Sequence, residues 1–171
     1  MSATTEPITF SQANAAQRAV RRFASSGPGS WVFARVSHHL DRVVYRATDG
    51  RNTLASLLAG LPIVMLTTTG AKSGRPRTVP IVGLPTDEGL AVIASNYGQE
   101  RHPAWYYNLA KNPEATAAVD DRSWRVRAVE AEGERRQRIW DEALKIYPGY
   151  STYEKRAAHR KIHVFVLEPV A

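Results

Sequence analysis

The sequence predicts an α+β fold in which an antiparallel β-barrel carries flanking helices. Three observations support this prediction. The central apolar runs are short, rich in β-branched residues and separated by tight turns, which is typical of antiparallel strands. Longer stretches with apolar residues at helical spacing lie before and after them. The chain of 171 residues is long enough for one domain with its own hydrophobic core.

Two amphipathic helices are expected before the barrel. Apolar residues recur at helical spacing over residues 11–24 and again over residues 32–47, with a Gly- and Pro-containing break between them. We therefore expect an N-terminal helical segment at residues 1–51 and the barrel domain at residues 52–171. These helices are expected to pack on the barrel, although a basic amphipathic helix can also lie on a membrane surface.

The middle of the chain predicts the strands of the barrel. The first three are residues 63–69, 78–84 and 90–95, joined by turns at residues 70–74 and 85–89. Each strand is short and apolar or β-branched, and each turn contains glycine. An antiparallel pair is expected at residues 115–119 and 124–129, and a final strand at residues 162–167.

Three helices are expected among and after these strands. They cover residues 103–111, 134–147 and 152–160. The middle helix has the clearest pattern, because Ile139, Trp140 and Ala143 belong to one apolar stripe. Pro148 and Gly149 are expected to end it.

The composition narrows the functional classes. The absence of cysteine excludes disulfides, thiolate metal sites and a cysteine nucleophile. No apolar run is long enough to span a membrane, and the first residues do not resemble a secretory signal, so a cytoplasmic protein is expected. The net charge of +7 favours an anionic partner. The basic residues are dispersed and no nucleic-acid-binding motif accompanies them, so nucleic acid is not expected as that partner.

A metal site is not expected either. His159 and His163 have a spacing that suits metal ligation on a helix, but the predicted helix ends between them. His38 and His39 have no recognisable third ligand in the sequence.

The turn between the first two strands is the most informative stretch. Gly70 and Gly74 let backbone N–H groups approach an anion closely, and Lys72, Arg75 and Arg77 supply positive charge. The order Gly-Ala-Lys-Ser differs from a phosphate-binding P-loop, which needs a glycine five residues earlier and a helix afterwards, so a nucleoside triphosphatase is excluded. The turn predicts an anion site, but taken alone it would equally suit a solvated basic loop.

Two further motifs follow this turn in the sequence. Residues 103–109 have the pattern Pro-x-Trp-Tyr-x-Asn-Leu, and residues 147–153 have the pattern Tyr-Pro-x-Tyr-x-x-Tyr. Together with the turn, Pro80 and the segment 93–98, this order of motifs closely resembles the deazaflavin (coenzyme F420)-dependent nitroreductase family of actinobacteria. Each motif alone is only suggestive, whereas the three in order are specific.

The resemblance implies a split β-barrel of the FMN-binding type that holds coenzyme F420 in a groove and reduces nitroaromatics, quinones or activated enones. The phosphate and oligoglutamate tail of the cofactor would meet Lys72, Ser73 and Arg77. The deazaflavin ring would lie against Pro80 and residues 93–96, covered by residues from the helix at 103–111. The full expected cofactor-binding set is Ala71, Lys72, Ser73, Arg77, Thr78, Val79, Pro80, Ile93, Ala94, Ser95, Asn96, Ala104, Trp105, Asn108 and Tyr150.

The same resemblance implies roles on the substrate side. Tyr150 and Ser95 would be the catalytic groups, because hydride addition leaves an anion on the acceptor that needs a proton or a hydrogen-bond donor. Tyr147, Tyr153 and Val82 would border the acceptor, although tyrosines at helix ends are equally often packing residues. Several nitroreductases of the family carry a tyrosine where this chain has Val82. Quinone or enone reduction is therefore a safer expectation than nitroimidazole reduction.

Two alternatives stay open at this stage. An FMN-dependent oxidoreductase would share the split barrel, and both cofactors carry a phosphate on a ribityl chain. A non-catalytic carrier of coenzyme F420 or of a lipid is the other, because Val82 removes one substrate-side hydroxyl. The expected partner is a small-molecule acceptor, and a homodimer or a peripheral membrane contact through the N-terminal helices is also left open.

Overall fold

The computed structural model describes residues 62–170 of the chain. The predicted N-terminal helical segment at residues 1–51 and the domain boundary at residue 52 lie outside the described residues and stay predictions. Within the described part, strands and helices are combined around one antiparallel sheet. The α+β class and the antiparallel architecture, which short strands and tight turns predict, are confirmed.

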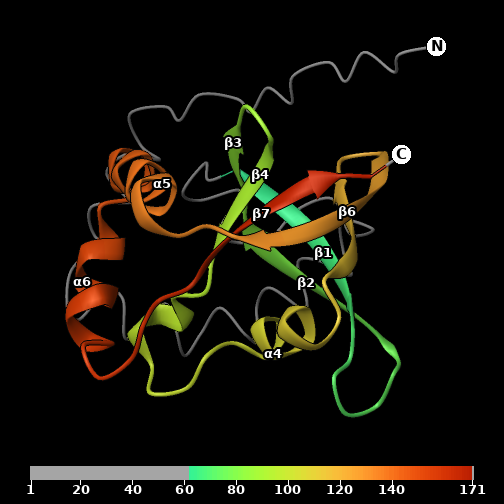
Figure 1. Ribbon diagram of the computed structural model, residues 1–171, viewed down its shortest axis with the longest axis horizontal. Helices are drawn as coiled ribbons and strands as arrows, with labels where there is room; N and C mark the ends of the chain where they lie inside the picture. Colours follow the sequence, from blue (N-terminus) through green and yellow to red (C-terminus); the bar gives the residue numbers. More distant parts are fainter. Residues whose placement is uncertain (1–61, 171) are drawn as a thin grey trace.

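Seven strands form a single curled sheet in this part of the chain (Figure 1). They are β1 (Ile63–Thr69), β2 (Pro76–Val82), β3 (Leu84–Thr86), β4 (Gly89–Ile93), β5 (Glu114–Val119), β6 (Arg122–Glu130) and β7 (Val164–Pro169). Their order across the sheet is β2-β1-β5-β6-β7-β4-β3, and all neighbours are antiparallel. The sheet curls until β2, at one edge, comes close to β4 near the other edge, as strands do in a barrel.

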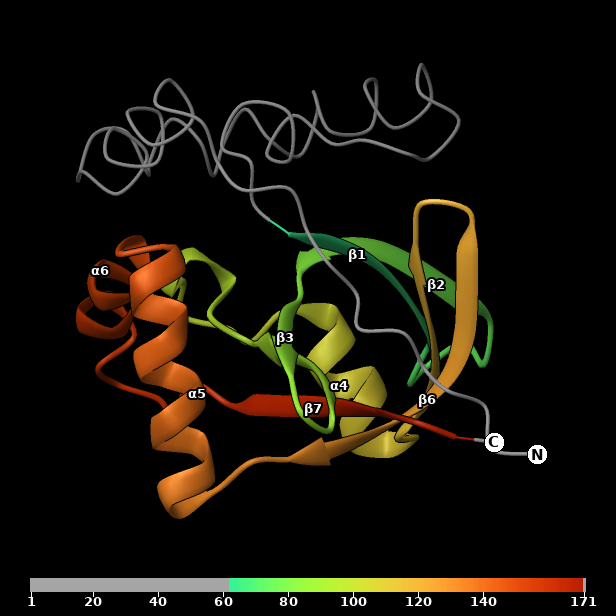
Figure 2. The ribbon, with the colours of Figure 1, turned by 90° about the horizontal axis from the view of Figure 1, so that it is seen from above.

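Helices flank the sheet on two sides. Helix α4 (Ala104–Lys111) lies against β1, whereas α5 (Gly133–Ile146) and α6 (Gly149–Arg156) contact each other. Figure 2 shows α5 and α6 together at one side of the sheet. The predicted stripe of α5 is confirmed, with Ile139 and Trp140 buried. No helix among residues 62–170 is long and apolar enough to cross a membrane.

The hydrophobic core has two halves, which lie on opposite faces of the sheet. One half packs between the sheet and helices α5 and α6, and the other fills the inside of the curl together with α4. Strand β7 contributes to both, because Val164 and Val166 belong to the first half while Phe165 and Leu167 belong to the second. A strand buried on both faces has a continuous apolar sequence, and residues 164–167 show it.

The predicted strands are present with bounds that differ by up to two residues, but β3 is not predicted, because the pattern places a turn at residues 85–89. Strand β1 has the predicted bounds, but β2 starts at Pro76 and ends at Val82, whereas the pattern predicts residues 78–84. A Cβ atom on Gly83 would lie 2.9 Å from Cγ1 of Val64, so glycine allows the backbone to approach β1 at the bend after β2. The apolar run continues through the bend, which is why periodicity does not reveal it.

The prediction for the last helix is wrong at both ends, because α6 covers Gly149–Arg156. The pattern places this helix at residues 152–160, but α6 begins at Gly149. Pro148 precedes it with helical angles, which proline tolerates at a helix start because the missing N–H has no partner there. Pro148-Gly149 therefore ends α5 and also begins α6, and Tyr150 lies in the first turn of α6.

Candidate active site

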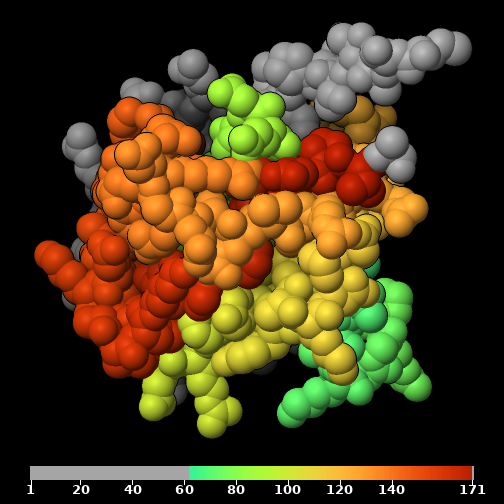
Figure 3. Space-filling view, in the orientation of Figure 1, coloured from blue at the N-terminus to red at the C-terminus, as the bar shows by residue number. Residues whose placement is uncertain are grey.

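The turn between β1 and β2 forms a compact loop that projects from the body of the protein (Figure 3, green, lower right). The Gly70 N–H donates to the Arg75 carbonyl at 2.9 Å, and the Gly74 N–H donates to the Gly70 carbonyl at 2.8 Å. Gly74 has a φ of +66°, a left-handed conformation that glycine adopts without strain. A Cβ atom on Gly70 would lie 2.6 Å from Oγ of Ser73, so the loop needs glycine there as well.

The positive charge of this turn is not neutralised by the described residues. Lys72, Arg75 and Arg77 are exposed, and none of them forms an ion pair with a carboxylate in the part of the chain that the structure describes. Basic residues elsewhere do pair, as Arg127 does with Glu114 at 3.0 Å. The turn therefore has the charge that a phosphate or a polycarboxylate ligand requires.

Ser73 can still donate a hydrogen bond to such an anion. Its Oγ accepts a weak hydrogen bond from the Arg75 N–H at 3.3 Å. A hydroxyl that accepts in this way keeps its own hydrogen for another partner. The arrangement fits the predicted contact of Lys72, Ser73 and Arg77 with an anionic tail.

Asn108 of α4 holds the turn in place through two hydrogen bonds. Its side-chain oxygen accepts a hydrogen bond from the Ala71 N–H at 2.8 Å, and its side-chain nitrogen donates to Oγ1 of Thr68 at 2.9 Å. The Nζ of Lys111, one turn further along α4, donates to the Ala71 carbonyl at 2.6 Å. Asn108 is buried and uses both ends of its amide, so the structure gives it a role in positioning the turn.

Strand β2 leads from this turn to the other end of the candidate site. Thr78, Pro80 and Val82 share one face of the strand, while Val79 packs into the core inside the curl. The Thr78 hydroxyl is hydrogen-bonded to that of Thr67 on β1 at 2.8 Å. The seven residues of β2 span about 20 Å at roughly 3.3 Å per residue. Val82, at the end of β2, packs against the half of the core that contains a group of tyrosines.

Three tyrosines, Tyr147, Tyr150 and Tyr153, form this group, which we call the tyrosine cluster. Their ring centroids lie 5.5 Å apart for the first two, 6.1 Å for the last two and 5.9 Å for the outer two. All three are buried and belong to the same half of the core as Ile93, with Val82 packed against it. The structure thus brings together five residues that the sequence assigns to the site.

The hydroxyls of the cluster differ in their partners. The Tyr147 and Tyr153 hydroxyls are 2.9 Å apart and hydrogen-bonded to each other. The Tyr150 hydroxyl has no hydrogen-bond partner among residues 62–170, although its ring packs on Trp140. Burial, together with the nearby Tyr147, raises the pKa of Tyr150 far above its ordinary value, so its hydroxyl keeps its proton. Tyr150 can therefore donate its hydrogen to a ligand without giving up a hydrogen bond within the described part of the protein.

Ser95 lies just beyond the end of β4 and is also buried, at 8% exposure. The backbone leaves the sheet here, and Asn96 and Tyr97 adopt positive φ angles of 47° and 57°. These left-handed residues turn the chain sharply into the short 3-10 helix Asn96–Gly98. The Asn96 side chain bonds to the Arg101 carbonyl at 2.8 Å and holds the turn.

Trp105 and Ala104 occupy different environments on α4. Trp105 is 7% exposed and packs edge-on against Phe165, with ring centroids 6.3 Å apart, whereas Ala104 is exposed. Ala94 is likewise fully buried in the same half of the core. Among the predicted covering residues, Trp105 thus supports the site from inside the core, and its contact with the cofactor ring stays a prediction.

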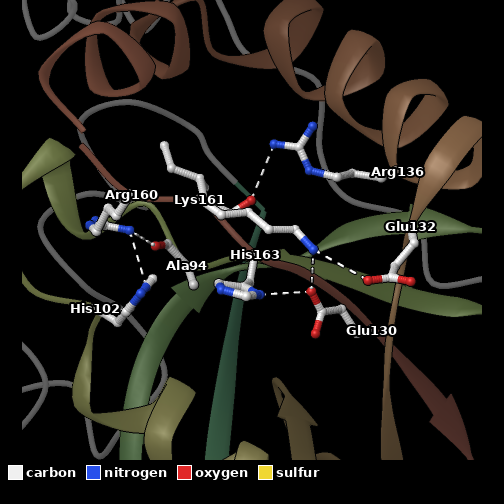
Figure 4. A network of polar contacts seen from close by, with 9 residues as sticks. Ala94, His102, Glu130, Glu132, Arg136, Arg160, Lys161 and His163 are labelled. Atoms are coloured by element: carbon white, nitrogen blue, oxygen red, sulfur yellow. Dashed lines mark hydrogen bonds and ion pairs between the residues drawn. The ribbon is translucent and has the colours of Figure 1, made fainter. Parts of the chain in front are cut away.

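A charged network that the sequence pattern does not reveal lies beside Ala94 (Figure 4). Nδ1 of His163 lies 2.7 Å from Oε1 of Glu130, and Lys161 reaches the same oxygen at 3.0 Å. Partial burial opposes ionisation of Glu130, but its hydrogen bonds from His163 and Lys161 outweigh burial and lower its pKa below the ordinary value. His159 points elsewhere, to the Glu100 carbonyl, so the two histidines considered as a metal pair do not share a contact.

Comparison with known proteins shows which family this chain belongs to. Residues 38–169 match the family described as F420H(2)-dependent quinone reductase. The chain belongs to this family. An F420H(2)-dependent quinone reductase of Mycobacterium tuberculosis (strain H37Rv) is 31% identical over 144 residues, which cover 80% of this chain and 95% of the relative.

Solved structures agree with the family assignment. A structure of an F420-H2 dependent reductase is 40% identical, with a TM-score of 0.57, and the match covers 63% of this chain and 94% of that one. A structure described as a domain-swapped dimer is 35% identical, with a TM-score of 0.59, and the match covers 83% of this chain and all of that one. The expected split β-barrel, the cofactor coenzyme F420 and the class of coenzyme F420-dependent oxidoreductase are thereby confirmed.

Proposed function

We propose that this F420H(2)-dependent quinone reductase family member transfers a hydride from reduced coenzyme F420 to a quinone. The observation that carries the proposal is the path of β2. This strand leads from a cationic turn without carboxylate partners among the described residues to the half of the core that contains the tyrosine cluster. An elongated ligand with a charged tail and an aromatic ring needs positive charge at one end of its site and a surface for its ring at the other.

The cationic turn would hold the tail of the cofactor. Lys72, Ser73 and Arg77 offer two charges and a hydroxyl, and the backbone at Ala71 is held in place by Asn108. The exposed or half-buried face of β2 would carry the ring-bearing part. The further residues proposed to contact it are Thr78, Pro80, Ile93, Ser95, Asn96 and Ala104.

The chemistry at the other end requires a proton. When bound, the reduced cofactor supplies a hydride. A quinone that gains a hydride becomes a hydroquinone anion, and one proton completes the hydroquinone. Tyr150, whose hydroxyl stays protonated because it is buried, is proposed to donate a hydrogen bond to the developing oxyanion, with Ser95 as a second donor, while the proton itself comes from solvent.

The acceptor preference is proposed from Val82. This side chain is half-buried against the half of the core that contains the tyrosine cluster, and it offers no hydroxyl. An apolar wall suits the flat ring of a quinone, whereas it offers no hydrogen bond to a nitro group. Tyr147 and Tyr153 pair with each other at 2.9 Å, so they are proposed to border the acceptor mainly through their rings.

We also propose a homodimer and a peripheral membrane contact. The solved relative described as a domain-swapped dimer supports a homodimer, which light scattering of the purified protein would test. A peripheral membrane contact would come from the predicted helices at residues 11–24 and 32–47, in a protein that otherwise works in the cytoplasm. Co-flotation with anionic lipid vesicles would test that contact, and a protein that stays at the bottom of the gradient would contradict it.

Turnover by the purified protein tests the function itself. Reduced coenzyme F420 should be oxidised when menadione is added, and the deazaflavin absorbance in the visible range should appear. Equilibrium titration should show tighter binding of coenzyme F420 than of FMN. Binding without turnover over a panel of quinones would indicate a carrier, and preference for FMN would contradict the proposal.

A further inference from the structure

Arg160 lies in the loop between α6 and β7 and donates hydrogen bonds to the backbone just after β4. Its guanidinium donates to three carbonyl oxygens: to Ser95 at 2.7 Å, to Gln99 at 3.0 Å and to Ala94 at 3.3 Å. Figure 4 shows that one nitrogen of the Arg160 guanidinium reaches both the Ala94 carbonyl and His102. One side chain therefore ties together both ends of the turn that carries Ser95.

Two of these carbonyls lie where the chain leaves the sheet, and the Ser95 carbonyl also accepts a hydrogen bond from the Gly98 N–H at 2.9 Å. Strand β4 ends at Ile93, and the turn that follows contains two residues with positive φ. The Ala94 N–H is held by the His163 carbonyl at 2.9 Å, but the carbonyls of Ala94 and Ser95 face the Arg160 side chain. A planar guanidinium can satisfy several carbonyls at once, which a lysine ammonium cannot do in the same geometry.

His102 completes the arrangement. Its Nδ1 lies 3.1 Å from Nη1 of Arg160, and its ring stacks on Tyr106 with centroids 4.3 Å apart. A guanidinium can only donate, so Nδ1 of His102 must accept, and the ring is neutral with its hydrogen on Nε2. The two side chains form one unit, which we call the Arg160 clamp: Arg160 with His102.

The clamp does not have the features of an anion-binding site. Each of the three guanidinium nitrogens of Arg160 already has an acceptor within the protein. The side chain is also partly buried, which lowers the pKa of Arg160 through desolvation. An arginine whose nitrogens are engaged in this way holds the backbone in place. An arginine that binds an anion keeps a pair of N–H groups free for the ligand.

We propose that Arg160 is a positioning residue that, together with His102, holds the Ala94–Ser95 peptide and thereby sets the place of the Ser95 hydroxyl at the active site. The effect on turnover rests on the proposed quinone reductase function. The effect on the backbone does not, because it follows from the hydrogen bonds alone. The two parts can therefore be tested separately in the full-length protein.

Three variants and a control test the proposal. Arg160→Ala removes the guanidinium, Arg160→Lys keeps the charge without the planar fork, and Arg160→Gln keeps hydrogen-bonding capacity without the charge. Arg122→Ala is the matched control, since Arg122 is an exposed arginine at the start of β6. Circular dichroism and thermal melting would first establish that each variant is folded.

Kinetics with reduced coenzyme F420 and menadione give the functional readout. Arg160→Ala should lower kcat about tenfold to hundredfold, because a small displacement of a reacting group costs this order of rate. The KM for the quinone and the Kd for the cofactor should change less than about threefold, since Arg160 is not among the residues proposed to contact either ligand. Arg160→Lys should recover only part of kcat, added guanidinium should restore part of kcat in Arg160→Ala, and Arg122→Ala should behave as wild type.

Hydrogen exchange gives a readout that is independent of turnover. Amides of residues 94–99 should exchange faster in Arg160→Ala than in wild type, while those of β5 and β6 stay unchanged. Wild-type kcat and wild-type exchange in Arg160→Ala would overturn the proposal, as would a loss of kcat that guanidinium does not restore. A wild-type protein without turnover would contradict the proposed function, and exchange at residues 94–99 would still decide the role of Arg160.

Discussion

The side-chain oxygen of Asn108 accepts a hydrogen bond of 2.8 Å from the backbone N–H of Ala71, which lies 37 positions earlier in the chain. This contact fastens the basic turn between β1 and β2 to helix α4. Because the other end of the same amide donates to Thr68, the turn and the last residues of β1 are held as one unit. A loop that binds an anion gains affinity when it is rigid before the ligand arrives.

Asn108→Ala should therefore weaken both folding and cofactor binding. The change leaves the Ala71 N–H without its partner and removes the donor to the Thr68 hydroxyl, which keeps its own bond to the Arg77 carbonyl. A buried group left without a partner costs about 1–3 kcal/mol of unfolding free energy. Denaturant unfolding and a titration with coenzyme F420 would measure the two effects. Lys111→Ala removes only an exposed contact to the Ala71 carbonyl and should have a much smaller effect on stability; equal losses in the two variants would contradict this account.

Removal of positive charge from the turn should weaken cofactor binding without loss of stability. Lys72 and Arg77 are exposed and have no carboxylate partner in the described part of the chain. Charge-assisted hydrogen bonds are worth roughly 1.5–3 kcal/mol, so Lys72→Ala and Arg77→Ala should each raise the Kd for coenzyme F420 about tenfold or more. Added salt should also raise the wild-type Kd.

The control for this experiment is Lys145→Ala. Lys145 is an exposed lysine on α5 that pairs with Glu142, outside the proposed site. The Lys145→Ala variant should bind the cofactor as the wild-type protein does. If Lys72→Ala and Arg77→Ala bind equally well, the turn is a solvated basic loop and the tail of the cofactor lies elsewhere.

Tyr150→Phe should lower kcat, whereas Tyr147→Phe should lower stability. The Tyr150 hydroxyl has no partner among residues 62–170, so its removal should leave the melting temperature unchanged and lower kcat, on the order of 10²-fold if it is the main donor and less if Ser95 substitutes. The Tyr147 hydroxyl is bonded to that of Tyr153 at 2.9 Å, so its loss should cost about 1 kcal/mol of stability and change kcat little. Steady-state kinetics and thermal melting separate the two roles, and wild-type kcat in Tyr150→Phe would remove Tyr150 from the mechanism.

The stability of the fold should fall as the pH drops below 6.5, the ordinary pKa of histidine. Partial burial, and then the charges of Arg160 and His163, lower the pKa of His102 in the folded protein. The unfolded chain binds a proton more readily, so the stabilising contribution is present above pH 6.5 and is lost as the pH falls through the folded pKa.

His102→Asn tests this pH dependence. The asparagine oxygen can accept from Arg160 as Nδ1 does, but asparagine does not titrate. Denaturant unfolding at a series of pH values should show a flatter profile just below pH 6.5 in the variant than in the wild type. Glu130, whose pKa is lowered by His163 and Lys161 despite partial burial, should still cause a loss of stability at more acidic pH in both proteins. Superimposable profiles would rule out His102 as the titrating group.

Much of the fold follows from local patterns. The bounds of β1 and the position of α4 were predictable because alternating burial, helical periodicity and turn residues are properties of neighbouring positions. The bend at Gly83 and the early start of α6 at Gly149 were not. In both cases the glycine is required by a side chain packed against it, Val64 in the first and Tyr147 in the second, and this contact has no local sequence signal.

The sequence by itself determined the family, the cofactor and the basic turn, because these depend on residue types in a fixed order along the chain. Only the tertiary structure decided which of the candidate residues face a ligand and which support the site. It brought Asn108 to the turn as an anchor, buried Trp105 against Phe165 and placed Arg160 beside Ser95, 65 positions earlier. The physical reason is that these contacts join segments far apart in the sequence, and such hydrogen bonds and packing exist only after the sheet has curled.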